Sequence, residues 1–492
     1  MVINKRIILL LSICYWTSAN ASEETSQIVS QKALFKVSTE QIMLPDNEPL
    51  GWIGSSYLLE VYPNFYIGGS LYGAATGNRG GFFSIGSEFT WRKELSQHWS
   101  SDIGTYIGGG GGAGANSLVG GGLVIRPHLD LLYTLDNYQI GVSASNVRFP
   151  YGTISSNQMG LVFTSLNDFT HTEQHSETIS TITQSANGLG FHRIRGTAAL
   201  YNGQLFESSN IDDTVTMLGM RADHFINPTT YWGIEVVGAA GGKLGGYGEY
   251  LATLGVEYPI LRQDILNIGG RVGIGMAGGG GAATKGGLIA KTGITLSANL
   301  SEHYHLSLEG GYMLAPAGKM QAKYIGADLT LDLSSPYTQT SSETVSNYEW
   351  QIGIFNYHAV TLENNTKSSP FSGVEIRINR FLSEHIYHGL HIMYAAKGAN
   401  YGGYGHTFAD IGYRFPVLHT LSLSTEVAVG GGGGGKISVG GGALYMGNIY
   451  LDYQLNNTLK LRLGIGRLQS LKGALNTTVS ELLITYDYSL TE

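Results

Sequence analysis

Cysteine is almost absent from this chain of 492 residues, which contains only Cys14. That residue lies within residues 1–21, which have the three parts of a cleavable export signal. These parts are a positive pair, an apolar run and a small-x-small cleavage site: Lys5-Arg6, Ile7–Ile13 and Ala19-Asn20-Ala21. The mature chain is therefore predicted to begin near Ser22 and to hold no cysteine, which excludes disulfides, thiol catalysis and cysteine-ligated metals.

Charge, proline and long apolar runs are also scarce. Only 13% of the residues are charged and the net charge is −8, so no segment is basic enough to bind nucleic acid. No apolar run after residue 21 approaches the length of a membrane-spanning helix. Glycine (71) and tyrosine (30) are abundant, against 11 prolines. An exported chain of this composition is predicted to be all-β, either a soluble protein or a transmembrane β-barrel.

Runs of glycine recur three times, and each is followed a few residues later by a shorter run. They are Gly108–Gly112 with Gly120–Gly122, Gly278–Gly281 with Gly286-Gly287, and Gly430–Gly435 with Gly440–Gly442. A second match pairs Gly245-Gly246-Tyr247-Gly248 with Gly402-Gly403-Tyr404-Gly405. Self-similarity of this kind along a chain is typical of proteins built from repeated units. It predicts three homologous units, 22–166, 191–333 and 348–492, separated by polar linkers at 167–190 and 334–347.

Apolar and polar residues alternate along about eight segments of each unit, as expected for strands. Each segment is close to the roughly 9–11 residues that a tilted membrane strand needs. The connections alternate between short turns, such as Pro63-Asn64, and longer or glycine-rich loops. Aromatic residues, such as Trp99 and Tyr453, gather beside the short turns. They form either an interfacial girdle or the ordinary aromatic content of strands. The alternation itself does not say which face points inward.

These features resemble the bacterial outer-membrane β-barrel proteins of the small eight-stranded type, repeated three times. The resemblance implies a transmembrane antiparallel up-and-down β-barrel fold in the cell outer membrane, with the short turns on the periplasmic side. It also implies contact with outer-membrane lipids or lipopolysaccharide, and insertion by the barrel-assembly machinery. Another membrane or surface protein is a further candidate partner. One feature departs from the class, because the chain ends Tyr488-Ser489-Leu490-Thr491-Glu492 and not on an aromatic residue.

The three units could close separately or open into one barrel of about 24 strands. The long polar linkers favour three separate barrels, because continuous pairing between units would need only a tight turn. The inward-facing charges also come in both signs within every unit, as the narrow interior of an eight-stranded barrel requires. The predicted networks contain Glu88, Arg92, Arg126 and Asp130 in the first unit, Glu257, Arg271, Lys291 and Glu309 in the second, and Asp410, Arg414, Glu426 and Arg462 in the third.

One set of residues raises the possibility of catalysis. Arg126, His128 and Asp130 share a strand face, next to Ser143 and Ser145 on the following strand. A Ser/His/acid set could support acyl chemistry on lipid A, provided that the imidazole reaches a serine. The alternative is an internal hydrogen-bond network, which is favoured because the set is not repeated in the other units. A non-enzymatic structural, interaction or transport role is therefore expected, with a lipid A-modifying enzyme and a soluble periplasmic β-barrel array as the alternatives.

No cofactor or metal is predicted. His385, His388 and His391 are spaced by three, which alternates the faces of a strand. The glycine runs lack the lysine and the serine or threonine of a phosphate-binding loop.

The glycine runs lie at the outer ends of the fifth and sixth strands of each unit. Without side chains they would form a thin wall against which an aromatic residue or a second barrel packs. A lateral opening or a lipid dock is the alternative. The glycines assigned to this patch are Gly110, Gly121, Gly279, Gly287, Gly432 and Gly441.

Overall fold

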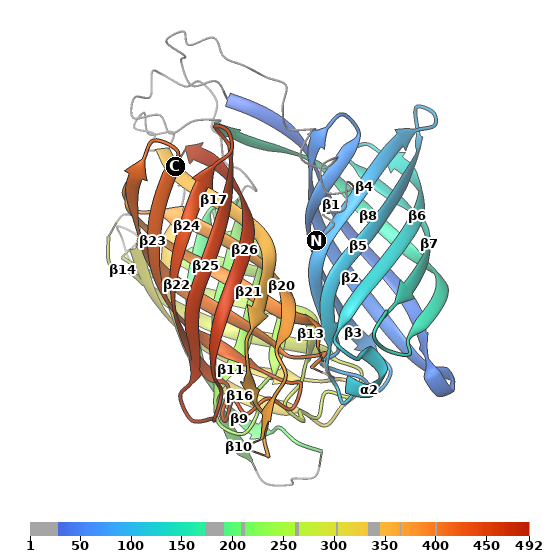
Figure 1. The fold of residues 1–492 in the computed structure, drawn as a ribbon, viewed down its shortest axis with the longest axis vertical. Helices are drawn as coiled ribbons and strands as arrows, with labels where there is room; N and C mark the ends of the chain where they lie inside the picture. Colours follow the sequence, from blue (N-terminus) through green and yellow to red (C-terminus); the bar gives the residue numbers. More distant parts are fainter. Residues whose placement is uncertain are drawn as a thin grey trace, which may run out of the picture.

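The computed structural model describes residues 28–172, 191–207, 212–260, 265–301, 304–332, 345–364, 366–398 and 401–491. The predicted export signal and most of the two polar linkers lie outside these ranges. Nearly all described segments are antiparallel strands (Figure 1). No helix among the described residues is both long enough and apolar enough to cross a membrane.

Barrel 1 is an up-and-down sheet of eight strands that closes when the first strand pairs with the eighth. That closing ladder is long, since it runs from Ile28 opposite Thr172 to Glu40 opposite Gly160. A single turn of helix, α2 (Asn116–Val119), lies between the fifth and sixth strands. The strands are β1 (Ile28–Leu44), β2 (Glu48–Tyr62), β3 (Phe65–Thr76), β4 (Phe83–Glu94), β5 (Trp99–Gly111), β6 (Leu123–Leu135), β7 (Tyr138–Arg148) and β8 (Ser155–Thr172).

Barrel 2 repeats this topology and closes through the pairing of its first and last strands. Its strands are β9 (Arg193–Gln204), β10 (Asp213–Asn227), β11 (Thr230–Gly241), β12 (Gly248–Pro259), β13 (Leu266–Gly278), β14 (Leu288–Asn299), β15 (Tyr304–Leu314) and β16 (Gln321–Asp332).

Barrel 3 closes in the same way and carries an extra two-stranded hairpin, β18 (Val360–Thr361) with β19 (Lys367–Ser368). Its barrel strands are β17 (Val345–Tyr357), β20 (Phe371–Phe381), β21 (Ile386–Lys397), β22 (Gly405–Leu418), β23 (Leu421–Gly433), β24 (Ala443–Gln454), β25 (Leu459–Ser470) and β26 (Asn476–Thr491). A single backbone bridge between Ser489 and Thr172 joins barrels 3 and 1, and it opens neither barrel. Three separate barrels are therefore confirmed over one wide barrel.

The three barrels share one register, marked by a β-bulge between the second and third strands of each. The bulge lies between Gly51 and Trp52 in barrel 1, between Thr216 and Met217 in barrel 2, and between Ser372 and Gly373 in barrel 3. On the third strand the pairing skips one residue there, and the next paired residue is Ala74, Ala239 or Ala395, opposite Trp52, Met217 or Gly373 respectively. Because a bulge shifts the pairing by one residue, its recurrence in the three units allows positions of the barrels to be matched one to one.

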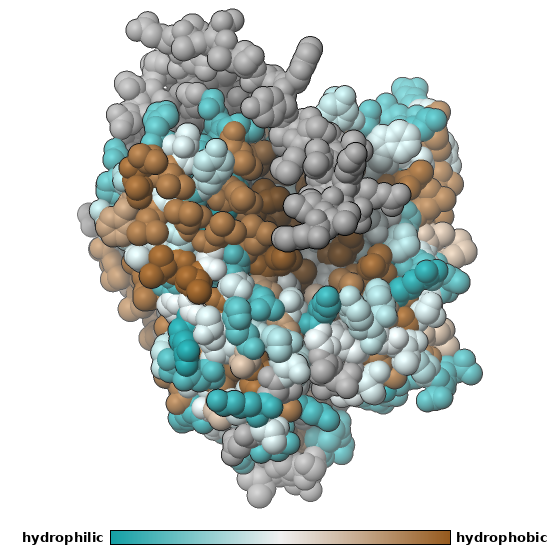
Figure 2. Space-filling view, in the orientation of Figure 1, coloured by the Kyte–Doolittle hydropathy of each residue, from teal (hydrophilic) through white to brown (hydrophobic). Residues whose placement is uncertain are grey.

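Apart from one buried apolar cluster in each barrel, the strands place polar residues inside and apolar residues outside. On β6, Leu129 and Leu131 are 52% and 41% exposed, whereas Arg126 and Asp130 are each 2% exposed. An apolar band covers much of the visible outer face of the barrels, and the end where they meet is more polar (Figure 2). This is the arrangement of a barrel in lipid, and the reverse of a soluble barrel. The structure thus determines the sense of the alternation, which the sequence leaves open.

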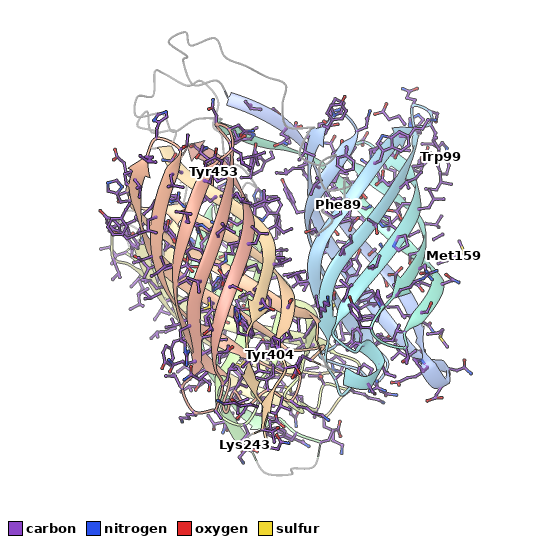
Figure 3. The ribbon with its side chains drawn as sticks, viewed as in Figure 1. Phe89, Trp99, Met159, Lys243, Tyr404 and Tyr453 are labelled. Atoms are coloured by element: carbon purple, nitrogen blue, oxygen red, sulfur yellow. The ribbon has the colours of Figure 1, made fainter. Side chains whose placement is uncertain are left out.

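The two ends of the barrels differ in character. Trp99 and Tyr453 lie near the end with the short turns, and Tyr404 and Lys243 lie near the opposite end (Figure 3). At the second end the glycine-rich connections bring the three barrels together (Figure 1). Barrels 1 and 3 also touch near the end with the short turns, where Phe169 packs against Tyr488.

Candidate functional site: filled interiors and a glycine-rich contact ring

The interior of barrel 1 is organised around Lys36 on β1. Its Nζ lies 2.8 Å from Asp130, 3.3 Å from Glu88 and 3.4 Å from Asp102. The lysine is 4% exposed, and the three carboxylates are no more than 2% exposed. Because β1 and β5 stand on opposite sides of the barrel, the contact with Asp102 crosses the interior.

Two arginines predicted to face inward also form buried ion pairs in barrel 1. Arg126 donates to Glu40 over 2.7 and 3.2 Å, and Arg92 donates to Asp102 over 2.7 and 2.9 Å. Such two-pronged contacts are the strongest form of this pair. Lys36, Glu40 and Asp102 are not among the residues predicted from the sequence. Each of them lies an even number of residues from other polar residues on the same strand, so the alternation of faces could have identified them as inward-facing.

Barrel 2 has a denser network around Arg221, which is fully buried. Its guanidinium lies 3.3 to 3.8 Å from carboxylate oxygens of Asp223, Glu235, Glu309 and Asp328. The residues predicted in this barrel lie in or beside the same network. Arg271 lies 2.7 Å from both Glu235 and Glu309, Lys291 lies 2.6 Å from Glu235, and Glu257 lies 3.0 Å from Arg193.

In barrel 3 the predicted Arg414 lies 2.6 Å from Glu349, and the predicted Arg462 lies 2.5 Å from Asp452. Glu426 accepts a hydrogen bond of 2.9 Å from Arg377, which stands three strands away. Asp410 is also buried, on a strand between them. Ion pairs that cross from strand to strand occupy the interiors of all three barrels, as expected where an eight-stranded interior is only wide enough for side chains.

The set around His128 lacks the geometry of a catalytic triad. Nε2 of His128 lies 3.4 Å from Glu88 and 3.7 Å from Asp130. The Ser145 hydroxyl donates to Glu40 over 2.6 Å. The imidazole is 5% exposed and lies inside the barrel wall. The arrangement therefore favours the internal network over a nucleophile presented to lipid.

The glycine runs form the contacts between barrels. A methyl group on Gly111 would lie 2.7 Å from the backbone nitrogen of Gly403, in the β21–β22 connection of barrel 3. The matched contacts follow the same pattern: a methyl on Gly278 would lie 2.3 Å from the nitrogen of Gly81, and one on Gly433 would lie 2.6 Å from the nitrogen of Gly246. We call these three equivalent contacts the contact ring.

The contact ring is directional and closes after three steps. Barrel 1 presents its glycine run to barrel 3, barrel 3 presents its run to barrel 2, and barrel 2 presents its run to barrel 1. Backbone hydrogen bonds cross two of the contacts: Gly402 donates to Gly120 over 2.9 Å, and Gly80 donates to Lys285 over 2.5 Å. A head-to-tail interface closes only when its rotation returns to the start, and here it does so within one chain.

The six glycines assigned from sequence face two different ways. Methyl groups on Gly121, Gly287 and Gly441 would meet the backbone of the neighbouring barrel within 2.3 to 3.1 Å. Gly110, Gly279 and Gly432 face their own barrel instead, against Phe83, Gly246 and His406 respectively. Because successive strand residues alternate sides, it is the neighbours of Gly110 and Gly432 that line the ring.

Aromatic side chains fill the space between the barrels inside the ring. Phe83 of barrel 1 packs edge-on against Tyr250 of barrel 2, with ring centres 4.9 Å apart. The Tyr250 hydroxyl lies 3.1 Å from the hydroxyl of Tyr394 in barrel 3. A cavity of about 40 Å³ remains beside them, room for little more than water. All three barrels thus contribute to one small joint core.

No protein-family model matches the chain, and no curated protein matches it. Among solved structures, the chain is similar to the outer membrane protein OpdK of Pseudomonas aeruginosa, with 9% identity over 94% of this chain and 99% of that one, and a TM-score of 0.25. It is similar to the siderophore receptor PirA of the same organism, with 9% identity over 95% and 81% and a TM-score of 0.28. OccAB4 of Acinetobacter baumannii gives 8% identity over 95% and 99%, with a TM-score of 0.24.

TM-scores this low do not assign the chain to a class. The class follows from its strand pairing and its exposed surface. Those features define an all-β chain of the transmembrane up-and-down β-barrel type, built three times over. The class-level resemblance seen in the sequence is confirmed by this fold.

Proposed function

We propose that the chain is an integral outer-membrane protein with a non-enzymatic role, in which the contact ring holds three filled barrels together as an interaction platform. The observation that carries the proposal is the inverted pattern of each barrel, with ion pairs inside and exposed leucine, isoleucine and valine outside. An apolar exterior of this extent needs lipid around it.

The proposed orientation puts the short turns in the periplasm and the contact ring at the cell surface. The longer connections of a β-barrel usually face outward from the cell, and here they carry the glycine runs. Lipid or lipopolysaccharide would surround the outer faces, and the barrel-assembly machinery would insert the chain after export. Another membrane or surface protein would then meet the platform at its ring end.

Fractionation of cells that express the full chain tests this proposal directly. We expect the protein in the outer-membrane fraction, with a folded band on an unboiled gel that shifts on boiling. Recovery from the soluble periplasmic fraction would overturn the proposal in favour of a soluble barrel array. His128→Ala separates out the enzyme alternative, because lipid A modified in a His128-dependent way would show as a mass change.

Because the barrel interiors are filled, the protein is expected not to conduct ions across a membrane. Purified protein in a planar bilayer is expected to give no large, stable conductance step, because cross-barrel ion pairs such as Lys36 to Asp102 occupy the interior. The Lys36→Met variant, which lacks this cross-barrel ion pair, is recorded under the same conditions, and its conductance is compared with that of the unaltered chain. A large step from the unaltered chain would contradict the closed-platform proposal and favour a transport role.

If the outer face lies in lipid, a charged residue placed on it should lower the stability of the barrel, and most so near the middle of the membrane. Leu129 is 52% exposed on the outer side of β6, so Leu129→Arg is expected to lower the unfolding free energy by about 2 kcal/mol in lipid vesicles. The measurement is urea unfolding followed by tryptophan fluorescence. Asn137→Arg, in the exposed turn after the same strand, is the matched control and should change little. Equal effects of both substitutions would show that the Leu129 face does not contact lipid.

A further inference from the structure

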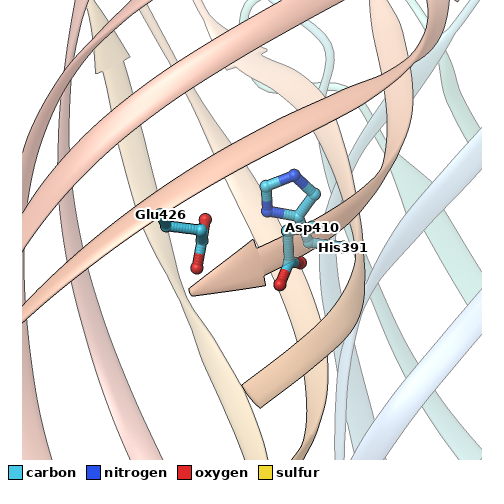
Figure 4. A group of neighbouring side chains, drawn as sticks. All are labelled: His391, Asp410 and Glu426. Atoms are coloured by element: carbon cyan, nitrogen blue, oxygen red, sulfur yellow. The ribbon is translucent and has the colours of Figure 1, made fainter. Parts of the chain in front are cut away.

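Three potential metal ligands converge inside barrel 3. His391 on β21, Asp410 on β22 and Glu426 on β23 lie on consecutive strands (Figure 4). One candidate ligand atom from each lies within 4.8 Å of the others. The three side chains are 0%, 7% and 3% exposed. Movements of about an ångström would bring all three atoms within bonding range of a single cation.

Two of these residues are left without hydrogen-bond partners. Within the described structure, neither ring nitrogen of His391 and neither carboxylate oxygen of Asp410 has one. The side-chain amide of Asn379 is also without a partner, and it faces Gly389 together with Asp410. Burying such groups unpaired is costly, and native interiors seldom do so. The unpaired atoms therefore point to a ligand between them.

The matching positions of the other barrels carry different residues. Counted from the shared β-bulge, His391 corresponds to Ser70 in barrel 1 and to Glu235 in barrel 2. Counted from the glycine at the start of the contact ring, Glu426 corresponds to Arg271. In barrel 2 those two positions form an ion pair of 2.7 Å between Arg271 and Glu235. Barrel 3 has a carboxylate where barrel 2 has a guanidinium.

A second cation is missing at the same level. Arg126 of barrel 1 and Lys291 of barrel 2 correspond to Met446 of barrel 3, each lying one strand beyond the position matched to Glu426. Arg126 and Lys291 are both paired with buried glutamates, Glu40 and Glu235. A thioether offers no charge, so barrel 3 lacks a cation at this one position. Arg377, which pairs with Glu375, Glu426 and Glu481, remains as a buried cation beside these carboxylates.

The buried charges reflect this loss. Among the described residues, barrel 2 buries five carboxylates with five lysine or arginine side chains, and barrel 1 buries four with three. Barrel 3 buries seven carboxylates with four. The seven are Glu349, Glu375, Asp410, Glu426, Asp452, Glu481 and Asp487, and the four are Arg377, Arg414, Lys460 and Arg462. Carboxylates in excess inside a narrow barrel must be neutralised.

We propose that barrel 3 holds a divalent transition-metal cation, bound by His391, Asp410 and Glu426. One imidazole nitrogen with carboxylate oxygens suits first-row divalent ions such as Zn²⁺, whereas Ca²⁺ and Mg²⁺ favour oxygen ligands alone. The Glu426 carboxylate is held in place by hydrogen bonds, from Arg377 and Tyr450 to one oxygen and from Tyr387 to the other. A divalent ion would lower the excess of buried negative charge in barrel 3 from three to one, which is the excess in barrel 1. It would also tie three adjacent strands together.

This site differs from the histidine set considered in the sequence. His388 and His391 stand on opposite sides of β21, as a spacing of three requires. The partners of His391 come from the two following strands, at sequence separations of 19 and 35 residues. Only the register of the barrel brings them together.

The test is zinc binding by the full chain. The protein is unfolded in urea with a chelator, refolded into detergent with ZnCl₂ as the only added metal, and dialysed, and bound zinc is counted by mass spectrometry. We expect about one zinc per chain, and an unfolding temperature higher than after refolding in chelator. Refolding with CaCl₂ should give neither effect.

Two variants carry the residues that the other barrels have at these positions. His391→Ser mirrors Ser70, and Asp410→Thr mirrors Thr253 of barrel 2. Both should still give the folded band on an unboiled gel, and both should lose the zinc. His98→Ser, at an exposed position of barrel 1, should keep it. No stoichiometric zinc on the unaltered chain, or zinc retained by either barrel 3 variant, would overturn the proposal and leave protonated carboxyls as the means of neutralisation.

Discussion

Lys36→Met is expected to lower the unfolding free energy of barrel 1 by about 3–5 kcal/mol. Methionine has nearly the shape of lysine, so the change removes the charge with little loss of packing. It leaves Glu88, Asp102 and Asp130 buried without the cation that lies within 3.4 Å of each. Removing one partner of a buried ion pair costs this much because the remaining charge is left uncompensated. Urea unfolding in lipid vesicles, followed by the folded band on an unboiled gel, measures it.

The comparison that isolates the charge is Lys93→Met, since Lys93 is exposed on the strand that carries Glu88. That variant should stay within about 0.5 kcal/mol of the unaltered chain. Adding Asp130→Asn to Lys36→Met should recover part of the loss, because the two substitutions share one network. A Lys36→Met chain as stable as the Lys93→Met chain would show that water or ions, and not Lys36, balance these carboxylates.

Much of the fold could be predicted from the sequence because apolar and polar residues alternate with a period of two along each strand. The alternation around Asp410 and Arg414 identified strands and the repeat identified three units, yet neither says which face meets lipid. Which face meets lipid is decided when the sheet closes into a barrel, because one face then lines an interior that is only wide enough for side chains. Lys36 and Asp102 were missed for a related reason: each has an ordinary alternating pattern around it, and its importance comes from meeting partners across the barrel.

The glycine runs show a second limit of sequence reasoning. A residue without a side chain has no polarity, so a run of glycines does not reveal which members face outward. In a membrane barrel the apolar Ile107 belongs on the lipid face, and counting by twos from it puts Gly109 and Gly111 outward and Gly110 inward. The structure agrees, because Ile107 is 39% exposed. Which barrel meets which run cannot be counted in this way, because it depends on how complete barrels pack.

Gly433→Val is expected to separate barrel 2 from barrel 3 while leaving both folded. The three nearest atoms to a side chain at this position belong to Gly245 and Gly246 of barrel 2, the closest at 2.6 Å. They are backbone atoms, which cannot turn aside as the end of a side chain would. The contact must therefore open, whereas the interior of barrel 3 is untouched. Gly447→Val is the control, because a methyl there would meet nothing within 4 Å.

Spin labels measure the separation. Cysteines at Lys243 of barrel 2 and Lys436 of barrel 3, both exposed near the ring, can carry the labels in a Cys14→Ser background. The distance distribution should be narrow in the unaltered chain and in Gly447→Val, and longer and broader in Gly433→Val. Urea unfolding should change by less than about 1 kcal/mol, because the barrels keep their own cores. An unchanged distance in Gly433→Val would show that this ring contact does not hold the barrels together. The contact between Tyr250 and Tyr394 in the joint core, whose hydroxyls lie 3.1 Å apart, would then be what holds barrels 2 and 3 together.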